Sequence, residues 1–386
     1  MRIALVSPWP PEASGIANYA VFFKSALENA GVEVTNVGLD LPDTRSYRDI
    51  EGIAERFPLS DMDLAHFELG GGRIRHFLLL DALLKRHPQL AITATIHDPE
   101  RLAWRGWGLS RFERWPRRVQ QALTVLTDPY SLRKERRVAG RLRRAVVLTH
   151  GGAAALVRRM GIPGDRVVVI PHGGAAVPYR EPSREGPLQI LFFGFLYPGK
   201  GIETLIEALC LVRAQGLGPG GIICTIAGGS RPTMLLKSSG NYVDSLADRL
   251  REGGIDDQAQ IVTDVAEADI PVLYQSHHLL VLPYIDSRKI SVLGRFMGSS
   301  GPLSWAIASG RGALVSDARA LAEEVAAGNG AVFRQGNPQD LAGWLVRLAA
   351  DRDRVMAWSA ASEALARERT WDEVGRKFAR LFAEIA

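Results

Sequence analysis

The sequence predicts an α/β protein of two domains, each a parallel sheet wrapped by helices. Short apolar runs that end in turns alternate along the chain with segments of helical apolar spacing, a pattern typical of parallel sheets with crossover helices. The alternation stops at a polar, proline-rich stretch, residues 177–187, and then starts again. The length of 386 residues also suits two domains of roughly 150–200 residues better than one core.

The first domain is expected over residues 1–180. Its strands are nearly continuous apolar runs, as expected for strands buried on both faces. Gly31 is a natural C-terminal stop for the first helix. The expected strands are residues 2–7, 32–37, 63–67, 90–96, 145–149 and 167–170, and the helices are 16–31 and 74–86.

The second domain is expected over residues 187–365, where the same alternation returns. The C-terminal helix, about 366–386 with an amphipathic stretch at 371–385, is expected to pack back on the first domain. The strands expected in the second domain are residues 188–193, 221–227, 259–262, 279–282 and 312–316, and the helices are 202–214, 242–251 and 303–309.

The composition is that of a globular protein and excludes disordered, collagen-like and disulfide-rich classes. Cys210 and Cys224 lie in apolar surroundings, which favours reduced, buried thiols in the cytoplasm. No apolar run reaches the ~18 residues of a membrane span, and the run at residues 3–6 is too short for a signal peptide. A cytoplasmic protein is therefore expected.

The net charge of +5 is unevenly distributed. Residues 101–144 hold thirteen Arg or Lys against three acidic residues, and aromatic residues (Trp104, Trp107, Phe112 and Trp115) lie among them. Such a segment suits an anionic membrane surface or a polyanionic acceptor. An Arg-rich pair of solvated helices is the alternative. Nucleic acid is not expected as a partner, because no recognised nucleic-acid module surrounds the segment.

Loops that follow parallel strands carry the chemistry in open α/β sheets. After the first strand, Ser14 and Gly15 open a helix whose free N–H groups suit a phosphate or a sugar hydroxyl; a simple capped helix start is the alternative. His97 and His172 each follow a strand, and each is either a functional or a structural histidine.

Lys200 and the 298–302 loop are two further anion-binding candidates. A strand ends at Gly194, a Pro-Gly turn follows, and Lys200 comes just before a helix, where a point charge and the helix start both favour phosphate. Ser300 and Gly301 begin another helix and could cradle phosphate through backbone amides. Solvated lysine and a surface loop are the alternatives. The four loops together predict a nucleotide diphosphate ester bound between the domains.

At this point the sequence resembles the family-4 glycosyltransferases, which are retaining enzymes with the GT-B fold of two Rossmann-like domains facing across a cleft. The resemblance covers nearly the whole chain. The motifs that carry it are SGIANY at 14–19, IHD at 96–98, IPHG at 170–173, FGFLYPGKG at 193–201, LPY at 282–284, and the Ser300-Gly301 helix start followed by ASG at 308–310.

The resemblance implies a role for several residues. His97 would contact the donor sugar and Lys200 would neutralise the donor diphosphate, which makes these two the expected catalytic residues. The other implied positions are Ser14, Gly15, Ser300 and Gly301 at the donor phosphates, Gly194, Gly228, Asp264 and Val265 at the nucleotide, and Asn18, Tyr19 and His172 on the acceptor side.

The sequence departs from the family pattern in two places. Many members have Arg after the glycine that corresponds to Gly194, where this chain has Phe195. Many also have two glutamates eight positions apart, where this chain has Met297 and Trp305. The missing positive charge is expected from Arg288, Lys289 or Arg295.

The expected activity is a metal-independent, retaining transfer of a sugar from a nucleoside-diphosphate sugar to a hydroxyl acceptor, such as a glycan or a lipid-linked intermediate. No cofactor other than the donor is expected. The alternatives are a weak or inactive GT-B partner subunit, suggested by Met297 and Trp305, and a sugar-nucleotide epimerase of the same fold. The epimerase would need a set of carboxylates in the cleft that this sequence does not clearly offer.

Overall fold

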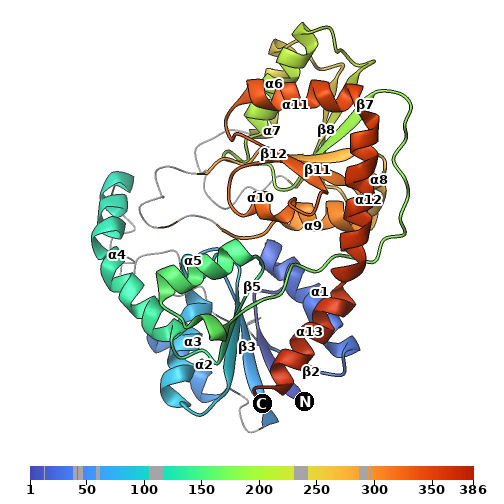
Figure 1. Cartoon of the computed structure of the whole chain (residues 1–386). Helices are drawn as coiled ribbons and strands as arrows, with labels where there is room; N and C mark the ends of the chain where they lie inside the picture. Colours follow the sequence, from blue (N-terminus) through green and yellow to red (C-terminus); the bar gives the residue numbers. More distant parts are fainter. Residues whose placement is uncertain are drawn as a thin grey trace. The chain divides into compact units, whose positions relative to one another are not determined.

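The computed structural model describes residues 1–12, 14–37, 41, 47–57, 61–103, 116–229, 242–286, 294 and 297–386. The chain divides into two compact units (Figure 1). The first consists of Met1–Gly173, Arg288–Ser299 and Trp371–Ala386, and the second of Gly174–Ser287 and Ser300–Thr370. The proline-rich stretch 177–187 thus belongs to the second unit.

The first unit is a six-stranded sheet with strand order β2-β1-β3-β4-β5-β6, and every neighbouring pair is parallel. Its central strands are completely buried, which explains their continuous apolar sequences. The strands are β1 Arg2–Val6, β2 Glu33–Val37, β3 Leu64–Leu69, β4 Ile92–Ile96, β5 Arg144–Val147 and β6 Val167–Val169. The helices are α1 Gly15–Asn29, α2 Tyr47–Glu55, α3 Ile74–Arg86, α4 Arg117–Ala139, α5 His150–Met160 and α13 Trp371–Ala383.

The second unit is also a six-stranded parallel sheet, with strand order β12-β11-β10-β7-β8-β9. The strands are β7 Leu188–Phe193, β8 Ile222–Gly228, β9 Ala259–Thr263, β10 Leu279–Leu282, β11 Gly312–Ser316 and β12 Gly330–Phe333. The helices are α6 Ile202–Ala214, α7 Tyr242–Glu252, α8 Ile270–Gln275, α9 Gly301–Ala308, α10 Leu321–Glu324, α11 Pro338–Ala350 and α12 Arg352–Glu368.

The expected fold class is confirmed: the two helix-flanked parallel sheets are the two Rossmann-like domains of a GT-B fold. Several elements were not anticipated from the sequence. The edge strand β12 has four residues and is only partly buried. Its sequence therefore lacks the long apolar run that marks a buried strand. The helices α2, α5, α8, α10, α11 and α12 were also not predicted. The described part of the basic segment contains the long helix α4, and residues 104–115 lie outside the described residues, so the alternative of a helix pair stays a prediction.

The strand order places a topological switch point in each sheet. β1 lies between β2 and β3, and β7 lies between β8 and β10. At such a point the connections from two neighbouring strands, β1 and β3 or β7 and β10, run toward opposite edges of the sheet. This opens a crevice at the carboxyl ends of the two strands. The loops after β1 and β3 in the first unit, and after β7 and β10 in the second, are therefore the places to look for a site.

The C-terminal helix α13 packs against α1 within the first unit. Val374, Phe378 and Phe382 are buried, and the ring centres of Phe378 and Phe23 are 4.5 Å apart. The backbones come close at Gly375, where a Cβ would lie 2.2 Å from the carbonyl oxygen of Ala26.

We expect Gly375→Ala to lower the free energy of unfolding of the first unit by about 1–3 kcal/mol, because the added methyl forces the two helices apart. The matched control is Gly343→Ala on α11, where a Cβ meets only the tip of Arg347 at 3.7 Å. The control should be neutral or stabilising by up to about 1 kcal/mol. Urea unfolding of both variants measures the difference, and equal effects would contradict the helix contact.

Candidate functional site

Lys200 lies at the switch point of the second unit, in the loop after β7. Its Nζ stands 3.8 Å from the ring centre of Tyr284, in the loop after β10, and 5.3 Å from that of Tyr197. The two loops touch at Gly201 (φ 71°), where a Cβ would lie 1.7 Å from the carbonyl oxygen of Pro283. The lysine is therefore held in place by the backbone of two neighbouring loops.

The surroundings of Lys200 disfavour the charged form of its ammonium group. The side chain is only 8% exposed, and burial followed by repulsion from Arg319 lowers its pKa to about 8, opposed by Tyr197. Within the described residues no carboxylate contributes to this pKa. A buried cation that is held by aromatic rings and lacks an anionic partner is typical of a binding site for an anion.

Two buried hydroxyl groups lie near the contact between Lys200 and the ring of Tyr284. Tyr284 Oη and Ser300 Oγ are both buried, and neither makes a hydrogen bond within the described residues. Ser300 nevertheless lies close enough to Tyr284 to lower its pKa, which burial raises. The Tyr284 hydroxyl also lies 3.8 Å from the position of a Cβ on Gly194, whose φ is 143°. Buried polar groups normally have partners, so this pair of hydroxyls indicates a place for a polar ligand.

The start of α9 already holds a carboxyl group of the chain itself. The backbone N–H of Ser300 donates to Glu324 Oε1 at 3.3 Å. Burial raises the pKa of Glu324 to about 8, opposed by Arg369. The expected role of the Ser300 amide in phosphate binding therefore requires Glu324 to move or to be displaced, and that role, like that of Gly301, remains a prediction.

The residues expected at the nucleotide lie on the other side of β7. Gly228 ends β8 with φ 148°, and a Cβ there would lie 1.7 Å from the carbonyl oxygen of Gly194. Asp264 follows β9 with a left-handed φ of 58° and is exposed, whereas Val265 packs partly against the core. These residues lie at or just after the carboxyl ends of β7, β8 and β9, which are neighbours in the sheet.

In the first unit, Ser14 caps α1. Its Oγ accepts a hydrogen bond from the N–H of Ala17 at 3.1 Å, as expected of a simple capped helix start. Gly15 is exposed, and a Cβ there would meet nothing within 4 Å. Asn18 is also exposed on this helix. The helix start is thus capped but leaves Gly15 and Asn18 open to solvent.

His97 belongs to a buried chain of polar side chains. Its Nε2 lies 2.6 Å from Glu68 Oε2, and the other oxygen of Glu68 lies 3.2 Å from His66 Nε2. Glu68 is fully buried, which raises its pKa, and burial lowers the pKa of His97 to about 4. His97 is therefore a neutral imidazole at pH 7, oriented by a buried carboxyl group.

Glu68 is not among the residues predicted from the sequence, although its position in an apolar strand could have indicated it. Glu68 is the acidic residue of β3, a strand in which all six residues are buried. A carboxyl group at such a position needs a buried partner.

Tyr19 and His172, expected on the acceptor side, pack around His97. The ring centre of Tyr19 lies 4.9 Å from that of His97, 5.2 Å from that of His172 and 5.0 Å from that of Trp371, each in an edge-on arrangement. The Tyr19 hydroxyl is buried without a hydrogen-bond partner in the described part of the chain. His172 donates from Nδ1 to the carbonyl oxygen of Gly173 at 2.6 Å, and burial lowers its pKa to about 4.

Several expected residues fall outside the site or outside the described residues. Arg288, Lys289 and Arg295 lie outside the described residues. Trp305, on α9, packs partly buried against the core of the second unit. Among the described residues, no group of three or more His, Cys, Asp or Glu side chains is placed to hold a metal ion.

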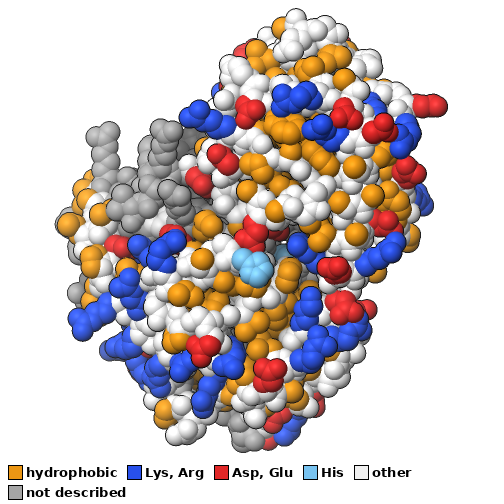
Figure 2. All heavy atoms as spheres, viewed as in Figure 1, with side chains coloured by type: hydrophobic (Ala, Val, Ile, Leu, Met, Phe, Trp, Pro, Cys, Tyr) orange, Lys and Arg blue, Asp and Glu red, His pale blue; other side chains and the backbone are white. Residues whose placement is uncertain are grey.

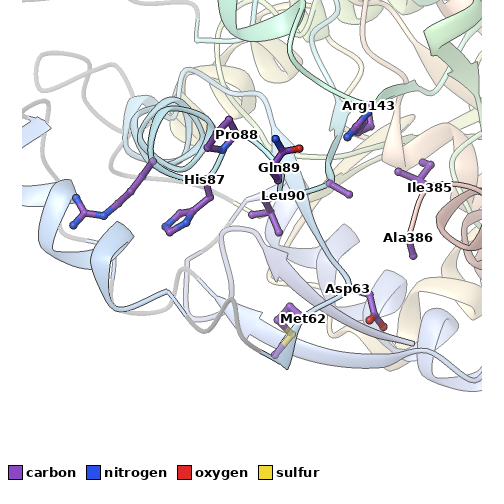
Figure 3. A pocket seen from close by; sticks show the side chains of 11 residues that line it. Met62, Asp63, His87, Pro88, Gln89, Leu90, Arg143, Ile385 and Ala386 are labelled. Atoms are coloured by element: carbon purple, nitrogen blue, oxygen red, sulfur yellow. The ribbon is translucent and has the colours of Figure 1, made fainter.

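A hollow of about 570 Å³ in the first unit lies at the opposite end of the sheet (Figure 3). Its walls include Asp63 before β3, Leu90 before β4 and Arg143 before β5, together with the C-terminal Ile385 and Ala386. These residues lie at the amino ends of the strands, whereas ligands of such sheets bind at the carboxyl ends. The hollow is therefore not the candidate site.

Residues 187–351 match the family model described as glycosyl transferases group 1. Apart from Arg288–Ser299, the matched region belongs to the second unit, and it contains Lys200, Tyr284 and Ser300. A sequence comparison with curated proteins gave no significant match.

Solved structures similar to the whole chain include HepE from Anabaena in complex with UDP and glucose, with 15% sequence identity, a TM-score of 0.69 and 100% coverage of both chains. Sucrose-phosphate synthase from Thermosynechococcus elongatus is 17% identical, with a TM-score of 0.70, over 100% of this chain and 98% of that one. A glycosyltransferase from Rickettsia africae is 14% identical, with a TM-score of 0.68, over 100% and 98% of the two chains. At these identities the likeness shows the fold.

We expect Lys200→Met to weaken the binding of a nucleoside diphosphate by at least about tenfold, because a charge-assisted contact is lost. The same change should raise the thermal unfolding midpoint at pH 7, since it removes a buried charge. In the unaltered chain, affinity should fall as pH rises through about 8, where the free protein loses the Lys200 proton. Calorimetric titration with a nucleoside diphosphate between pH 6 and 10 measures the affinities of the unaltered chain and of Lys200→Met.

The control for this prediction is Lys24→Met, because Lys24 forms an exposed pair with Glu28 on α1. It should leave both affinity and its pH dependence unchanged. An affinity that stays constant up to pH 10 would mean that Lys200 does not contact the ligand.

Proposed function

We propose that the chain is a glycosyltransferase that moves a sugar from a nucleoside-diphosphate sugar to a hydroxyl group of an acceptor. The observation that carries the proposal is Lys200, a buried cation at the switch point of a domain that matches glycosyl transferases group 1. The neighbouring hydroxyls of Tyr284 and Ser300 lack partners among the described residues and suit phosphate oxygens. HepE was solved with UDP and glucose, which supports a nucleotide sugar as the donor.

The proposed chemistry is stabilisation of a leaving diphosphate. As the bond from the anomeric carbon to the phosphate oxygen breaks, negative charge grows on the leaving group, and a fixed cation in a water-poor site stabilises that charge. Lys200 supplies this cation. We propose that the transfer proceeds with retention of configuration and without a metal ion, with the leaving phosphate accepting the proton of the acceptor hydroxyl.

We propose that His97 contacts the donor sugar as a hydrogen-bond acceptor. With its Nε2 proton donated to Glu68, the imidazole keeps Nδ1 as an acceptor nitrogen. Because the pKa of His97 is about 4, this state persists at neutral pH. A hydroxyl group of the sugar can then donate to Nδ1.

A panel of UDP-, GDP-, ADP- and dTDP-sugars tests the function. We expect slow release of nucleoside diphosphate from one donor, acceleration by a hydroxyl acceptor, and a product with the anomeric configuration of the donor by NMR. The rate should survive EDTA and should fall by at least about tenfold in Lys200→Met.

Release with inversion would contradict the retaining mechanism, and a loss of activity in EDTA would contradict metal independence. The absence of both release and nucleoside-diphosphate binding across the panel would overturn the proposed function. Conversion of one free nucleotide sugar into its epimer would instead identify an epimerase.

We further propose that α4 contacts an anionic membrane surface, where a lipid-linked or other glycan acceptor would be found. Leu126 and Tyr130 are 74% and 67% exposed and lie four residues apart on α4. The exposed Arg133 and Arg137 follow Tyr130 by about one and two turns of the helix. Exposed apolar and basic side chains on one helix suit a membrane interface. Figure 2 shows Lys and Arg side chains gathered over this part of the first unit.

Some of the basic residues of segment 101–144 form buried ion pairs instead of lying on the surface. Arg101 is buried and paired with Asp128 and, at 2.6 Å, with Glu135. Residues 104–115, with their four aromatic residues, lie outside the described residues. No helix in the described part of the chain has the length and hydropathy of a membrane span.

Sedimentation with anionic vesicles at low salt tests the membrane contact. We expect the unaltered chain to bind, and the double change Leu126→Ser with Tyr130→Ser to weaken binding by about tenfold through the loss of apolar burial. The matched control is Val272→Ser, since Val272 is an exposed apolar residue in the second unit. Equal binding by the double variant and the control would contradict a contact through α4.

A further inference from the structure

Arg319 reaches the same aromatic ring as Lys200. It lies in the turn after β11, and its guanidinium carbon stands 4.9 Å from the ring centre of Tyr284, on which Lys200 Nζ stands at 3.8 Å. The three residues come from the loops after three different strands, β7, β10 and β11. Two cations therefore gather on one buried tyrosine.

The backbone holds Arg319 in an unusual conformation. Its φ is 57°, in the left-handed region that side chains with a Cβ rarely adopt. The N–H of Arg319 donates to Asp286 Oδ2 at 3.4 Å, and the N–H of Asp286 in turn donates to Gln335 Oε1 at 2.8 Å. Strained backbone that is held by its surroundings is common at functional sites, and here it fixes the direction of an arginine.

The charges of Lys200 and Arg319 act on each other. Arg319 is the charge that, after burial, lowers the pKa of Lys200 most, which shows that the two cations repel each other. A ligand with two or more negative charges would turn this repulsion into attraction for both groups. The unpartnered hydroxyls of Tyr284 and Ser300 in the described structure independently indicate that a polar ligand belongs there.

We propose that Arg319 is the second cation of the diphosphate site and sets the preference for a nucleoside diphosphate over the monophosphate. The inference rests on the proposed function and deepens it. It also supplies the positive charge that Phe195 lacks, from a loop that is distant in sequence. Arg319 binds one phosphate group while Lys200 binds the other, and the planar guanidinium gives two N–H donors to phosphate oxygens.

The test compares Arg319→Gly and Arg319→Lys with the unaltered chain. Each protein is titrated with UDP, GDP, ADP and dTDP, and the best-bound diphosphate is then compared with its own monophosphate. Arg319→Gly should lose about tenfold to a hundredfold in affinity for the diphosphate and much less for the monophosphate. Arg319→Lys, which keeps a cation, should retain part of the preference.

The glycine variant guards against misfolding as an explanation, because glycine adopts a φ of 57° without strain. Its thermal unfolding midpoint should equal or exceed that of the unaltered chain. The matched control is Arg347→Gln on α11, because Arg347 also stands on an aromatic ring, 4.5 Å from the ring centre of Trp344. This control should leave the preference unchanged.

The outcomes separate this inference from the proposed function. If the unaltered chain binds none of the four diphosphates, the proposed function fails. If the unaltered chain binds one of them and Lys200→Met loses it, but Arg319→Gly keeps both the affinity and the preference for diphosphate, only the role of Arg319 is overturned.

Discussion

The contact between the Lys200 ammonium and the ring of Tyr284 determines how the second unit is organised around its site. A lysine that leaves water needs a substitute for its hydration, and among the described residues the substitute is an aromatic face at 3.8 Å rather than a carboxylate. This choice keeps the charge available to a ligand. It also requires the loops after β7 and β10 to approach closely, which only glycine at position 201 allows, with its φ of 71° and the carbonyl of Pro283 beside it.

The first unit has a different arrangement of charge near the carboxyl ends of its strands. There, a buried carboxyl group, Glu68, backs a neutral histidine, His97, and Tyr19 packs edge-on against the imidazole. The second unit therefore offers positive charge and the first offers an oriented, uncharged hydrogen-bonding group.

Local patterns predicted much of the fold and some of the site. Buried parallel strands are visible as apolar runs, and a chemistry-bearing residue directly after such a run, such as Lys200 or His97, can be found without knowing the pairing. The edge strand β12 is too short and too exposed for that signal. The same local view gave Ser14 two possible roles, and the structure shows its capping bond to Ala17.

The residues that were missed depend on contacts between distant parts of the chain. Glu324 reaches the Ser300 amide across 24 positions, and Arg319 reaches Tyr284 only because β10 and β11 are neighbours in the sheet. The left-handed backbone of Arg319 has no sequence signal, since such conformations usually belong to glycine. Spacing along the chain cannot reveal such convergence, whereas the buried acid in β3 could have been noticed.

The most direct test of this account is the pKa of the Lys200 side chain itself, followed by NMR of the labelled Nζ and Cε atoms with and without the best-bound nucleoside diphosphate. The account predicts a pKa of about 8 in the free protein and a clear increase when the diphosphate binds, because a nearby anion favours the charged ammonium. A pKa near the ordinary lysine value of about 10.4 that does not respond to the ligand would contradict it.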